Sequence, residues 1–408
     1  MNASSHPFES LRIPNFALYF SSQFIYNAGT WFRTLALALV LFSYTGSALS
    51  VAGMSFAQFL PMLLLGPLAG AVADRFPVLR MLITATLISI VVAIVMFLVV
   101  ATQQQSQILL YSIVAMSGVV NTFERAGSQV LIYQLVDDRL LSNAVSLNTV
   151  TVSAARSVGP ALAGLLFASA GASACFLVNL LAYLVVAVLL ASIRSRKFFV
   201  RPMGHQTKHG IRQAWAAMVG TPGFVLLFIP TCVISLIVFN FLVTLTAFTL
   251  TTVNGSPADL GIAHSLNAAG AVVGGLAVSA WRKVSLRAYA VACLLLGITL
   301  SVTGLAPDLA VFLVLSPVLG IGIGYYQSTL YSTAQHIAPS EIRGRMMALI
   351  NMAVYGLTPI GAVAAGLLIE VTSARFALEL GAILCVISSV AVAMLAGRVK
   401  QIEAISTS

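Results

Sequence analysis

Long apolar runs repeat along the whole chain, and each is about as long as a helix must be to cross a lipid bilayer. A bilayer core about 30 Å thick takes roughly 20 apolar residues at about 1.5 Å per residue. Only 8% of the residues are charged and 59% are hydrophobic, whereas soluble domains carry roughly a quarter charged residues. We therefore predict an all-α membrane protein with twelve transmembrane helices. The runs lie at residues 16–42, 48–73, 80–101, 108–133, 143–170, 173–193, 223–251, 257–281, 287–305, 309–335, 345–370 and 374–397.

The longest polar stretch divides these runs into two sets of six. We predict an N-terminal six-helix half at residues 1–193, a cytoplasmic linker at 194–222 that includes a helix on the membrane surface, and a C-terminal six-helix half at 223–408. The halves share short sequence echoes, such as AGLLF at 163–167 and AGLLI at 365–369. Two parallel halves place a binding site between them near the middle of the membrane, with access alternating as they rock.

The positive charges are unevenly distributed between the two sides of the predicted membrane. Of the 21 Lys and Arg residues, most lie in alternate loops on the side of the N-terminus. The positive-inside rule places that side, with both termini, in the cytoplasm. The net charge of +10 follows from this topology, so no nucleic-acid partner is expected. The four cysteines lie far apart within apolar runs, which favours buried free thiols over disulfides or a metal site.

An acid–base pair, Asp74-Arg75, ends the second run and follows Gly70 by four residues. Arg80 is the next base, after Pro77. This pattern, expected between the second and third helices, resembles the signature loop of the major facilitator superfamily. The resemblance implies that the loop holds the cytoplasmic side closed while the outer side is open. Gly70 would allow a close approach of backbones, and a charge pair at the membrane edge forms and breaks at modest cost.

Three further stretches are similar to signatures of the same superfamily, including a Gly-Pro motif typical of its antiporters. They are ARSVGPALAG at 155–164 with Gly159, Pro160 and Gly164, NAVSLN at 143–148 followed by Arg156, and QHIAPSEIRGRMMAL at 335–349 with Arg343 and Arg345. Together they resemble the bacterial exporter subgroup related to the enterobactin exporter and the macrolide efflux proteins. The resemblance implies the major facilitator fold, a place in the bacterial inner membrane, and a cavity lined by the first and fourth helices.

Charged residues inside the predicted spans are candidates for function, because each costs at least about 2.5–3.5 kcal/mol to insert. Glu124 is the only acid well inside a span of the N-terminal half. One interpretation makes it a proton carrier, with burial favouring the neutral acid and a nearby arginine compensating the charge. The other makes it half of a structural ion pair near the cytoplasmic end of its helix.

Three arginines lie within predicted spans, and their fork of donors could bind an anionic or catecholate-like substrate. They are Arg33, Arg125 and Arg156. We favour substrate binding most for Arg33. Arg125 and Arg156 could instead anchor the cytoplasmic gate with Asp137 or Asp138, and for Arg156 we favour that structural role.

Polar residues of cavity-lining helices are further candidates for substrate binding or coupling. They are Asn27 in the first run, Asn121 in the fourth, and Tyr325 and Gln327 in the tenth. The stretch GIGIGYYQ at 320–327 lacks the strand-to-helix context and the lysine of a phosphate-binding loop, so its glycines are predicted to pack helices. No metal site and no cofactor are expected, since the five histidines do not cluster.

The function predicted from these features is export of a small amphipathic molecule, a siderophore or a drug, by proton antiport and alternating access. Its expected partners are the substrate, protons and the lipid bilayer, and a monomer is expected. A lipid flippase on the same fold is the alternative. An enzyme is disfavoured because no span combines catalytic groups at workable spacing, and a membrane sensor because the chain has no sizeable polar output domain.

Overall fold

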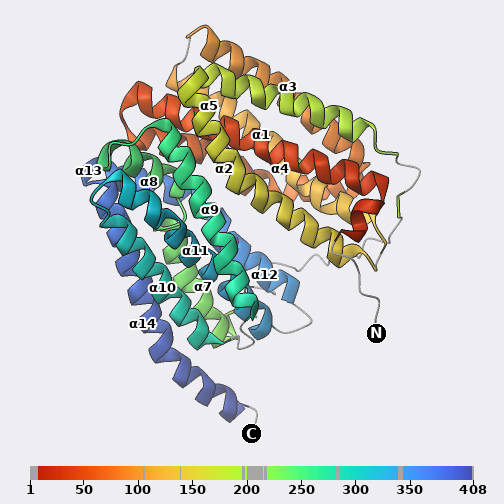
Figure 1. Ribbon diagram of the computed structural model, residues 1–408. Coiled ribbons are helices and arrows are strands. Elements are labelled where there is room, and N and C mark those ends of the chain that lie inside the picture. Colours follow the sequence, from red (N-terminus) through yellow and green to blue (C-terminus); the bar gives the residue numbers. More distant parts are fainter. Residues whose placement is uncertain are drawn as a thin grey trace. The chain divides into compact units, whose positions relative to one another are not determined.

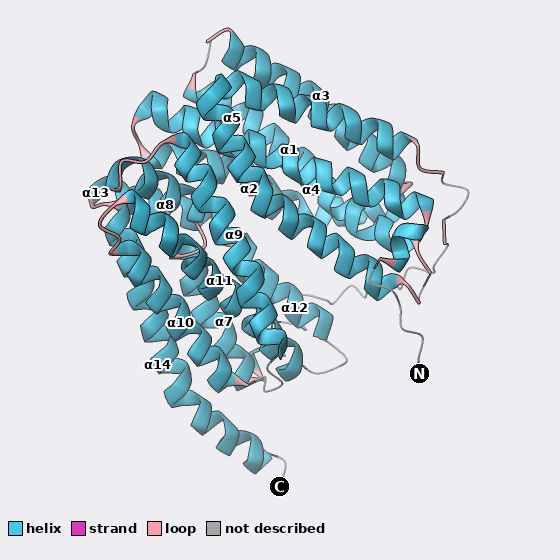
Figure 2. Cartoon of the chain, viewed as in Figure 1, coloured by secondary structure: helices cyan, strands magenta, loops and turns pink. Residues whose placement is uncertain are grey.

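Figure 1 shows the computed structural model of the chain, which describes residues 8–103, 106–137, 139–194, 198–199, 215, 218–280, 285–338 and 343–406. Every regular element within these residues is a helix, and no strand is drawn among them (Figure 2). The all-α prediction is confirmed for this part of the chain. Most of the predicted surface helix in the linker lies outside the described residues.

The helices begin and end close to the predicted apolar runs. Those of the first part of the chain are η1 (Glu9–Arg12), α1 (Pro14–Thr45), α2 (Ala48–Arg75), α3 (Val78–Ala101), α4 (Gln107–Leu135) and α5 (Leu141–Ala191). Those of the second part are α7 (Pro222–Ile237), α8 (Phe241–Ala247), η3 (Phe248–Thr252), α9 (Pro257–Ala280), α10 (Leu286–Gly304), α11 (Leu309–Ile337), α12 (Arg343–Asn351), η4 (Met352–Gly356), α13 (Thr358–Val371) and α14 (Ala374–Ser406).

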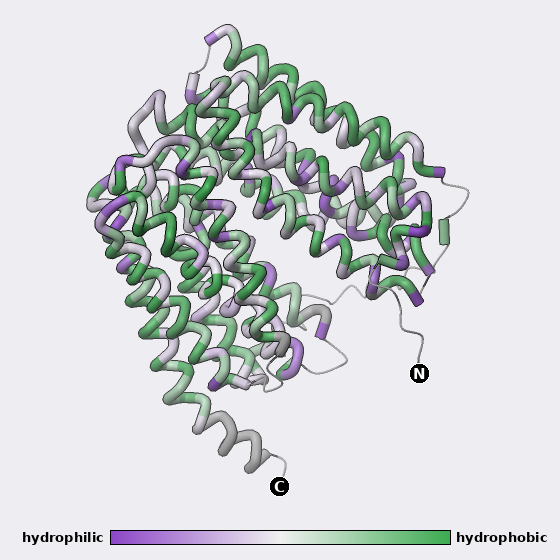
Figure 3. The backbone as a smooth tube through the Cα atoms, in the orientation of Figure 1, coloured by the Kyte–Doolittle hydropathy of each residue, from purple (hydrophilic) through white to green (hydrophobic). Residues whose placement is uncertain are grey.

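Ten helical stretches of the described residues are long and apolar enough to cross a membrane. Figure 3 shows hydrophobic residues along much of their length. One stretch, Asn143–Ala191, has 49 residues, which is about 70 Å of helix and more than one passage needs. The 29-residue α4 is not among the ten, because it carries several polar and charged side chains. The number of twelve spans stays a prediction.

The long helix α5 bends back on itself at Gly171. This residue has φ +77° and ψ −179°, a conformation that glycine adopts far more readily than other residues. The Cys175 thiol lies 3.5 Å from the carbonyl oxygen of Ala163, so the chain after the bend returns along the chain before it. The predicted runs 143–170 and 173–193 are therefore two helical arms of α5, separated by the non-helical residue Gly171.

Two predicted spans are not continuous α-helices. In the run at 223–251, α7 ends at Ile237, α8 begins at Phe241, and the π-helical turn η3 follows. In the run at 345–370, the π-helical turn η4 separates α12 from α13. The apolar runs did not predict these interruptions, because hydropathy registers neither a break such as that at residues 238–240 nor the extra residue that a π-helical turn inserts.

The residues Gly70 to Arg75 lie inside α2, which contradicts the prediction that they form a loop. α2 continues to Arg75 and α3 begins at Val78, so only Phe76 and Pro77 separate the two helices. Nothing in the apolar sequence stops α2 earlier, and a proline disfavours the helical conformation of the residue before it. The Asp-Arg pair therefore occupies the last turn of a helix.

The chain forms two compact units. One comprises residues 1–45 and 57–204, and the other comprises 46–56 and 205–408. The start of α2 belongs to the second unit, in which Ser47 Oγ donates a hydrogen bond of 2.9 Å to Glu370 Oε2 of α13. The division into halves at 1–193 and 223–408 with a linker at 194–222 stays a prediction.

In the first unit, α1 packs against both arms of the bent α5. Asn179 of the second arm donates from Nδ2 to the carbonyl oxygen of Gly29 at 2.9 Å. On the first arm, a Cβ added to Gly159 would lie 2.8 Å from the Trp31 Cβ, and Pro160 and Gly164 are buried beside it. Close packing at the Gly-Pro motif is thus observed, and it positions the buried face of α1.

In the second unit, α9 and α11 are in backbone contact through glycines. A Cβ on Gly324 would clash with the carbonyl oxygen of Ala271, and a Cβ on Gly270 would clash with that of Pro317. Gly320 packs in the same way against α9. Small residues at such positions allow transmembrane helices to approach closely. The prediction that the glycines of this stretch pack helices is therefore confirmed for Gly320 and Gly324.

We expect Gly324→Ala to lower the melting temperature of the protein in detergent, since its Cβ overlaps backbone that cannot move aside. Overpacking of this kind costs about 1–3 kcal/mol. The matched control is Gly66→Ala on α2, where nothing lies within 4 Å of the added Cβ. Equal melting temperatures for the two variants, measured by thermal unfolding of purified protein, would contradict the packing described for α9 and α11.

Candidate functional site

Glu124 of α4 is an acid buried in the first unit, with 6% of its side chain exposed. Two hydrogen bonds reach its Oε1 atom. Gln23 of α1 donates from Nε2 at 3.0 Å, and Ser128, one turn further along α4, donates from Oγ at 2.7 Å. Gln23 Nε2 also donates to Ser128 Oγ at 2.9 Å. The three side chains form a closed polar cluster between α1 and α4.

Both donors to Glu124 are neutral, which suits a carboxyl group that changes its charge. A hydrogen bond to a charged group stabilises by about 1.5–3 kcal/mol, whereas an unpaired buried ion costs several kcal/mol. Two such bonds offset much of the cost of the charge. Because no guanidinium is paired with the carboxylate, a proton can neutralise Glu124 without leaving a buried cation behind.

The ion pair that the structural interpretation of Glu124 requires is not found in the described part of the chain. The salt bridge present there joins Arg139 to Glu9, on the surface. Arg125, the next residue of α4, is exposed and interacts with Glu124 only through the longer-range field of its charge. The ion pair of the structural interpretation is therefore absent among the described residues, and an amide and a hydroxyl bond the carboxylate instead. The nearby arginine expected for a proton carrier is Arg125, which acts on Glu124 without contact.

The α1 face beside Glu124 is polar and buried. Tyr19 donates from its hydroxyl to the backbone oxygen of Ser128 at 3.2 Å. Tyr26 packs against Tyr183 with ring centroids 5.3 Å apart. Asn27 is half-buried and donates from Nδ2 to the carbonyl oxygen of Gln23 at 2.7 Å. The predicted candidate Asn27 thus bonds to the backbone of α1 one turn from the Glu124 cluster.

Arg33 lies ten residues after Gln23 on α1, about 15 Å further along the helix axis. Its side chain is only 7% exposed, and it makes no ion pair or hydrogen bond with the described residues. A buried guanidinium without a carboxylate partner is costly, so an anionic group at this level of α1 would be bound favourably. The field of Arg33 reaches Tyr26, as does that of Glu124.

The remaining candidate residues of the first unit are more exposed than Glu124 and Arg33. Arg125 and Arg156 are exposed, and Asn121 is half-buried. Asp137 accepts a hydrogen bond of 3.0 Å from the backbone N–H of Leu140 rather than pairing with Arg156. Asp138 lies outside the described residues. The predicted gate anchor between Arg156 and Asp137 is therefore absent from the described contacts.

In the second unit, Tyr326 is enclosed, whereas its neighbours Tyr325 and Gln327, the predicted candidates for substrate binding, are less buried. Tyr325 and Gln327 are half-buried, while Tyr326 between them is fully buried. The hydroxyl of Tyr326 lies 3.2 Å from that of Tyr289 and 3.3 Å from Thr231 Oγ1. This hydroxyl cluster joins α7, α10 and α11.

Among the predicted gating and packing residues, Gly159, Pro160 and Gly164 are buried in the packing of α5 described above, whereas the others that the structure describes are exposed or loosely packed. Nothing lies within 4 Å of a Cβ added to Gly70, so the expected close approach at that residue is not seen among the described residues. Arg75, Arg80 and Arg343 are exposed, and Arg343 Nε donates to the carbonyl oxygen of Ala338 at 3.4 Å. The side chains of Asp74 and Arg345 lie outside the described part.

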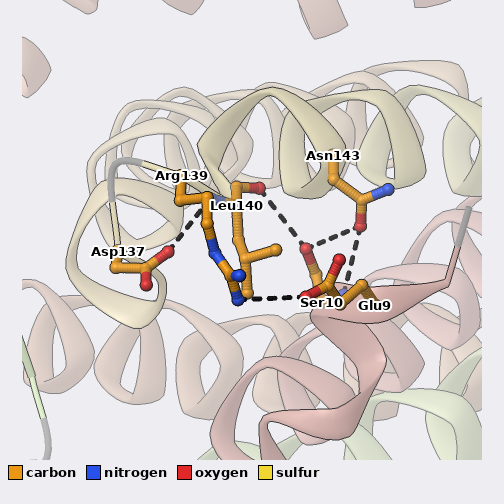
Figure 4. Close-up of polar contacts among 6 residues, drawn as sticks. All are labelled: Glu9, Ser10, Asp137, Arg139, Leu140 and Asn143. Atoms are coloured by element: carbon orange, nitrogen blue, oxygen red, sulfur yellow. Dashed lines mark hydrogen bonds and ion pairs between the residues drawn. The ribbon is translucent and has the colours of Figure 1, made fainter. Parts of the chain in front are cut away.

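Another polar cluster of the first unit joins η1 to the start of α5 and to the residues just before it (Figure 4). Asn143 Oδ1 accepts from Ser10 Oγ at 2.7 Å and from Ser10 N at 3.1 Å. The Arg139–Glu9 pair of 3.0 Å lies beside it. This N-terminal contact cluster places η1 and the start of α1, and through them Gln23, against α4.

Sequence reasoning missed Gln23, Ser128, Tyr289 and Thr231. The available signal for Gln23 was its place as an amide within a membrane-spanning run, four residues before the candidate Asn27 and therefore on the same helix face. Ser128 follows Glu124 by four residues, which also places both on one face. Neither spacing identifies the partner helix, so their meeting with Glu124 required the structure.

Comparison with known proteins shows similarity along the whole chain. The family described as transmembrane secretion effector matches residues 5–408. The staphyloferrin A transporter of Staphylococcus aureus is 26% identical over 174 residues, which cover 42% of this chain and 43% of that relative. Macrolide efflux protein A of Streptococcus pyogenes is 22% identical over 343 residues, which cover 82% of this chain and 84% of the relative.

Solved structures of transporters share the fold. A bacterial homologue of the iron transporter ferroportin, in an inward-facing state, superposes with a TM-score of 0.72 and 18% identity over 94% of this chain and 98% of that one. A peptide transporter, POT, superposes with a TM-score of 0.74 and 12% identity over 98% of this chain and 96% of that one. At these identities the likeness concerns the fold alone.

We expect the N-terminal contact cluster to depend on Asn143 far more than on the ion pair beside it. Asn143→Ala removes the acceptor of the two shorter Ser10 hydrogen bonds, leaves Ser10 Oγ only the longer bond of 3.4 Å to Leu140 O, and should destabilise by about 1–2 kcal/mol. Arg139→Gln breaks a pair whose arginine is 69% exposed, and exposed pairs contribute about 0–1 kcal/mol. Thermal unfolding in detergent would measure both, and a larger loss for Arg139→Gln would contradict this ranking.

Proposed function

The chain belongs to the transmembrane secretion effector family, whose fold neighbours are transporters of the major facilitator type, and we propose that it exports a small amphipathic molecule across the bacterial inner membrane by proton antiport. The two relatives named above transport staphyloferrin A or macrolides according to their names. A siderophore or a macrolide-like drug is therefore the substrate class that we propose. The chain is a transporter and not an enzyme.

The observation that carries the coupling proposal is the environment of Glu124. The residue is 6% exposed, and its carboxyl group accepts two hydrogen bonds from neutral donors and has no arginine paired with it among the described residues. Such a group can hold a charge or a proton at moderate cost in either state. A carboxylate in a buried ion pair with a guanidinium would stay charged, and it could not take up and release a proton in each transport cycle.

In the proposed cycle, Glu124 takes up a proton from the outer side and releases it to the cytoplasm. Protonation drives the return from the outward-open to the inward-open state, and the substrate moves outward in the opposite step. The transporter works as a monomer of twelve helices with both termini in the cytoplasm. Gly70, Asp74, Arg75 and Arg80 contribute to closing the cytoplasmic side.

Arg33 is the proposed contact for an anionic group of the substrate. It is buried at a level of α1 about 15 Å from the Glu124 cluster, and it lacks a described acidic partner. The substrate and proton sites are thus separate, so proton binding acts on the substrate through movement of α1 rather than through direct competition for one carboxylate.

Glu124→Gln should abolish export driven by a pH gradient, because the amide cannot carry a proton. Everted membrane vesicles with an imposed pH gradient would show this as loss of uptake of erythromycin, a macrolide, or of staphyloferrin A. Glu9→Gln, which alters an acid at the surface, should leave uptake unchanged. Wild-type uptake rates for Glu124→Gln would remove Glu124 from the proton path, and no wild-type uptake of either probe would contradict the substrate class.

Arg33→Gln should raise the KM for a carboxylate-bearing probe such as staphyloferrin A by about 10- to 100-fold, the loss expected for one charge-assisted hydrogen bond. Arg33→Lys should recover part of the effect because it restores the charge without the fork of donors. Equal KM values for wild type and Arg33→Gln in the vesicle assay would show that Arg33 does not contact the substrate.

A further inference from the structure

We propose that Gln23 and Ser128 are positioning residues that set the pH at which Glu124 exchanges its proton. They hold the charged carboxylate through Oε1 and leave Oε2 to receive the proton. This inference rests on the proposed role of Glu124 as the proton carrier. It assigns a function to the two hydrogen bonds of the carboxyl group, from the Gln23 amide of α1 and the Ser128 hydroxyl of α4. Through the first of them, the charge of Glu124 affects how firmly α1 is held.

The hydrogen bonds among Gln23, Ser128 and Glu124 end at one oxygen atom, Glu124 Oε1, either directly or through the Ser128 hydroxyl. Gln23 Nε2 uses its two hydrogens on Glu124 Oε1, at 3.0 Å, and on Ser128 Oγ, at 2.9 Å. Ser128 then donates its own hydrogen to the same Oε1 at 2.7 Å. Because every hydrogen of the cluster is directed this way, the arrangement is complementary to a carboxylate that carries a negative charge.

Oε2 is the atom left for the proton. It makes no hydrogen bond with the described residues, and it is not among the fully enclosed atoms that lack a partner. A proton that arrives at Oε2 therefore breaks none of the three hydrogen bonds. It does weaken the two bonds at Oε1, because a neutral carboxyl group is a poorer acceptor than a carboxylate.

The weakened bonds connect the proton to the movement of α1. Ser128 belongs to the same helix as Glu124, and Tyr19 holds its backbone oxygen at 3.2 Å. Gln23 belongs to α1, the helix that also carries Asn27 and Arg33. Neutralising Glu124 weakens the link that Gln23 makes between α1 and α4, while the bond from Tyr19 of α1 to the Ser128 carbonyl oxygen remains. The helix with the proposed substrate contact is therefore held less tightly at Gln23 when the proton binds.

Other ionisable groups lie around the cluster and stay unchanged in the variants proposed below. Tyr19, Tyr26 and Arg125 interact electrostatically with Glu124. Along the helices of this unit, the described charged or titratable side chains include Tyr19, Tyr26 and Arg33 of α1, Arg75 of α2, Arg80 of α3, Tyr111, Arg125 and Tyr133 of α4, and Arg156, Cys175 and Tyr183 of α5.

The test follows the carboxyl group directly by infrared spectroscopy of the full chain in liposomes. The C=O stretching band of a protonated carboxyl is recorded while the pH is varied, and the band of Glu124 is the one that Glu124→Gln removes. Its pH midpoint needs no transported substrate, so it is independent of what the protein exports.

Gln23→Leu keeps the approximate volume and removes both donors, and Ser128→Ala removes one. We expect the midpoint to move to higher pH, by about one to two units for Gln23→Leu and by about one unit for Ser128→Ala, as the loss of charge-stabilising hydrogen bonds implies. Ser117→Ala is the matched control, since Ser117 is a buried serine of the same helix that donates to Ile113 O and not to Glu124. It should leave the midpoint in place.

An unchanged midpoint in both Gln23→Leu and Ser128→Ala would overturn the inference, and so would an equal shift in Ser117→Ala. If Gln23→Leu fails to fold, the comparison of Ser128→Ala with Ser117→Ala decides alone. A Glu124 band that titrates and shifts as expected, in a protein that exports neither probe, would contradict the proposed function and leave this inference standing. No titrating Glu124 band in the wild type would overturn both.

Discussion

The cost of a charged carboxyl group inside a membrane-spanning helix is the constraint on which the rest of this site depends. Glu124 meets that cost with an amide and a hydroxyl at 3.0 and 2.7 Å. A salt bridge would stabilise the charge more but would make neutralisation leave a buried cation. Neutral donors keep the charged and protonated states close in free energy, and a proton carrier needs both states.

The packing of the first unit holds Gln23 of α1 within hydrogen-bonding distance of Glu124 of α4. Gln23 reaches Glu124 only if α1 is held at one height and one rotation against α4. Three contacts far from each other fix that position: the N-terminal contact cluster around Asn143, the amide of Asn179 on Gly29, and the close packing of Gly159 on Trp31. Because all three involve residues of α5, on both sides of Gly171, the bend at that residue is part of what positions the site.

The described contacts of the second unit include hydroxyl–hydroxyl hydrogen bonds and close packing of helices at glycines. Three of its buried polar groups, those of Tyr289, Tyr326 and Thr231, bond to one another through their hydroxyls. Helices α9 and α11 approach through glycines until their backbones touch. Acids of this unit also accept hydrogen bonds from neutral donors, as Glu379 Oε2 does from Ser301 Oγ at 2.7 Å and Asp259 Oδ2 does from the backbone N–H and hydroxyl of Ser256. Glu124 differs from them in its burial, since the residue is only 6% exposed, and we therefore assign the proposed proton chemistry to the first unit.

Hydropathy was sufficient to predict the helical class, most helix limits and the burial of Glu124 and Arg33, because each follows from long apolar runs and the cost of charge within them. It could not predict partners. Arg125 is adjacent to Glu124 in sequence, yet successive residues of a helix point to different sides, and the carboxylate meets Gln23 from 101 positions earlier in the chain. The interruption after Ile237 and the inclusion of Arg75 in α2 were also missed, since both depend on backbone geometry that an apolar pattern does not encode.

The most direct measurement is proton release on substrate binding. Purified protein in weakly buffered detergent solution is mixed with erythromycin or staphyloferrin A while the pH is followed. The account predicts proton release by the wild type and none by Glu124→Gln that still binds the probe. Equal proton release by the two proteins would contradict the claim that Glu124 carries the exchanged proton.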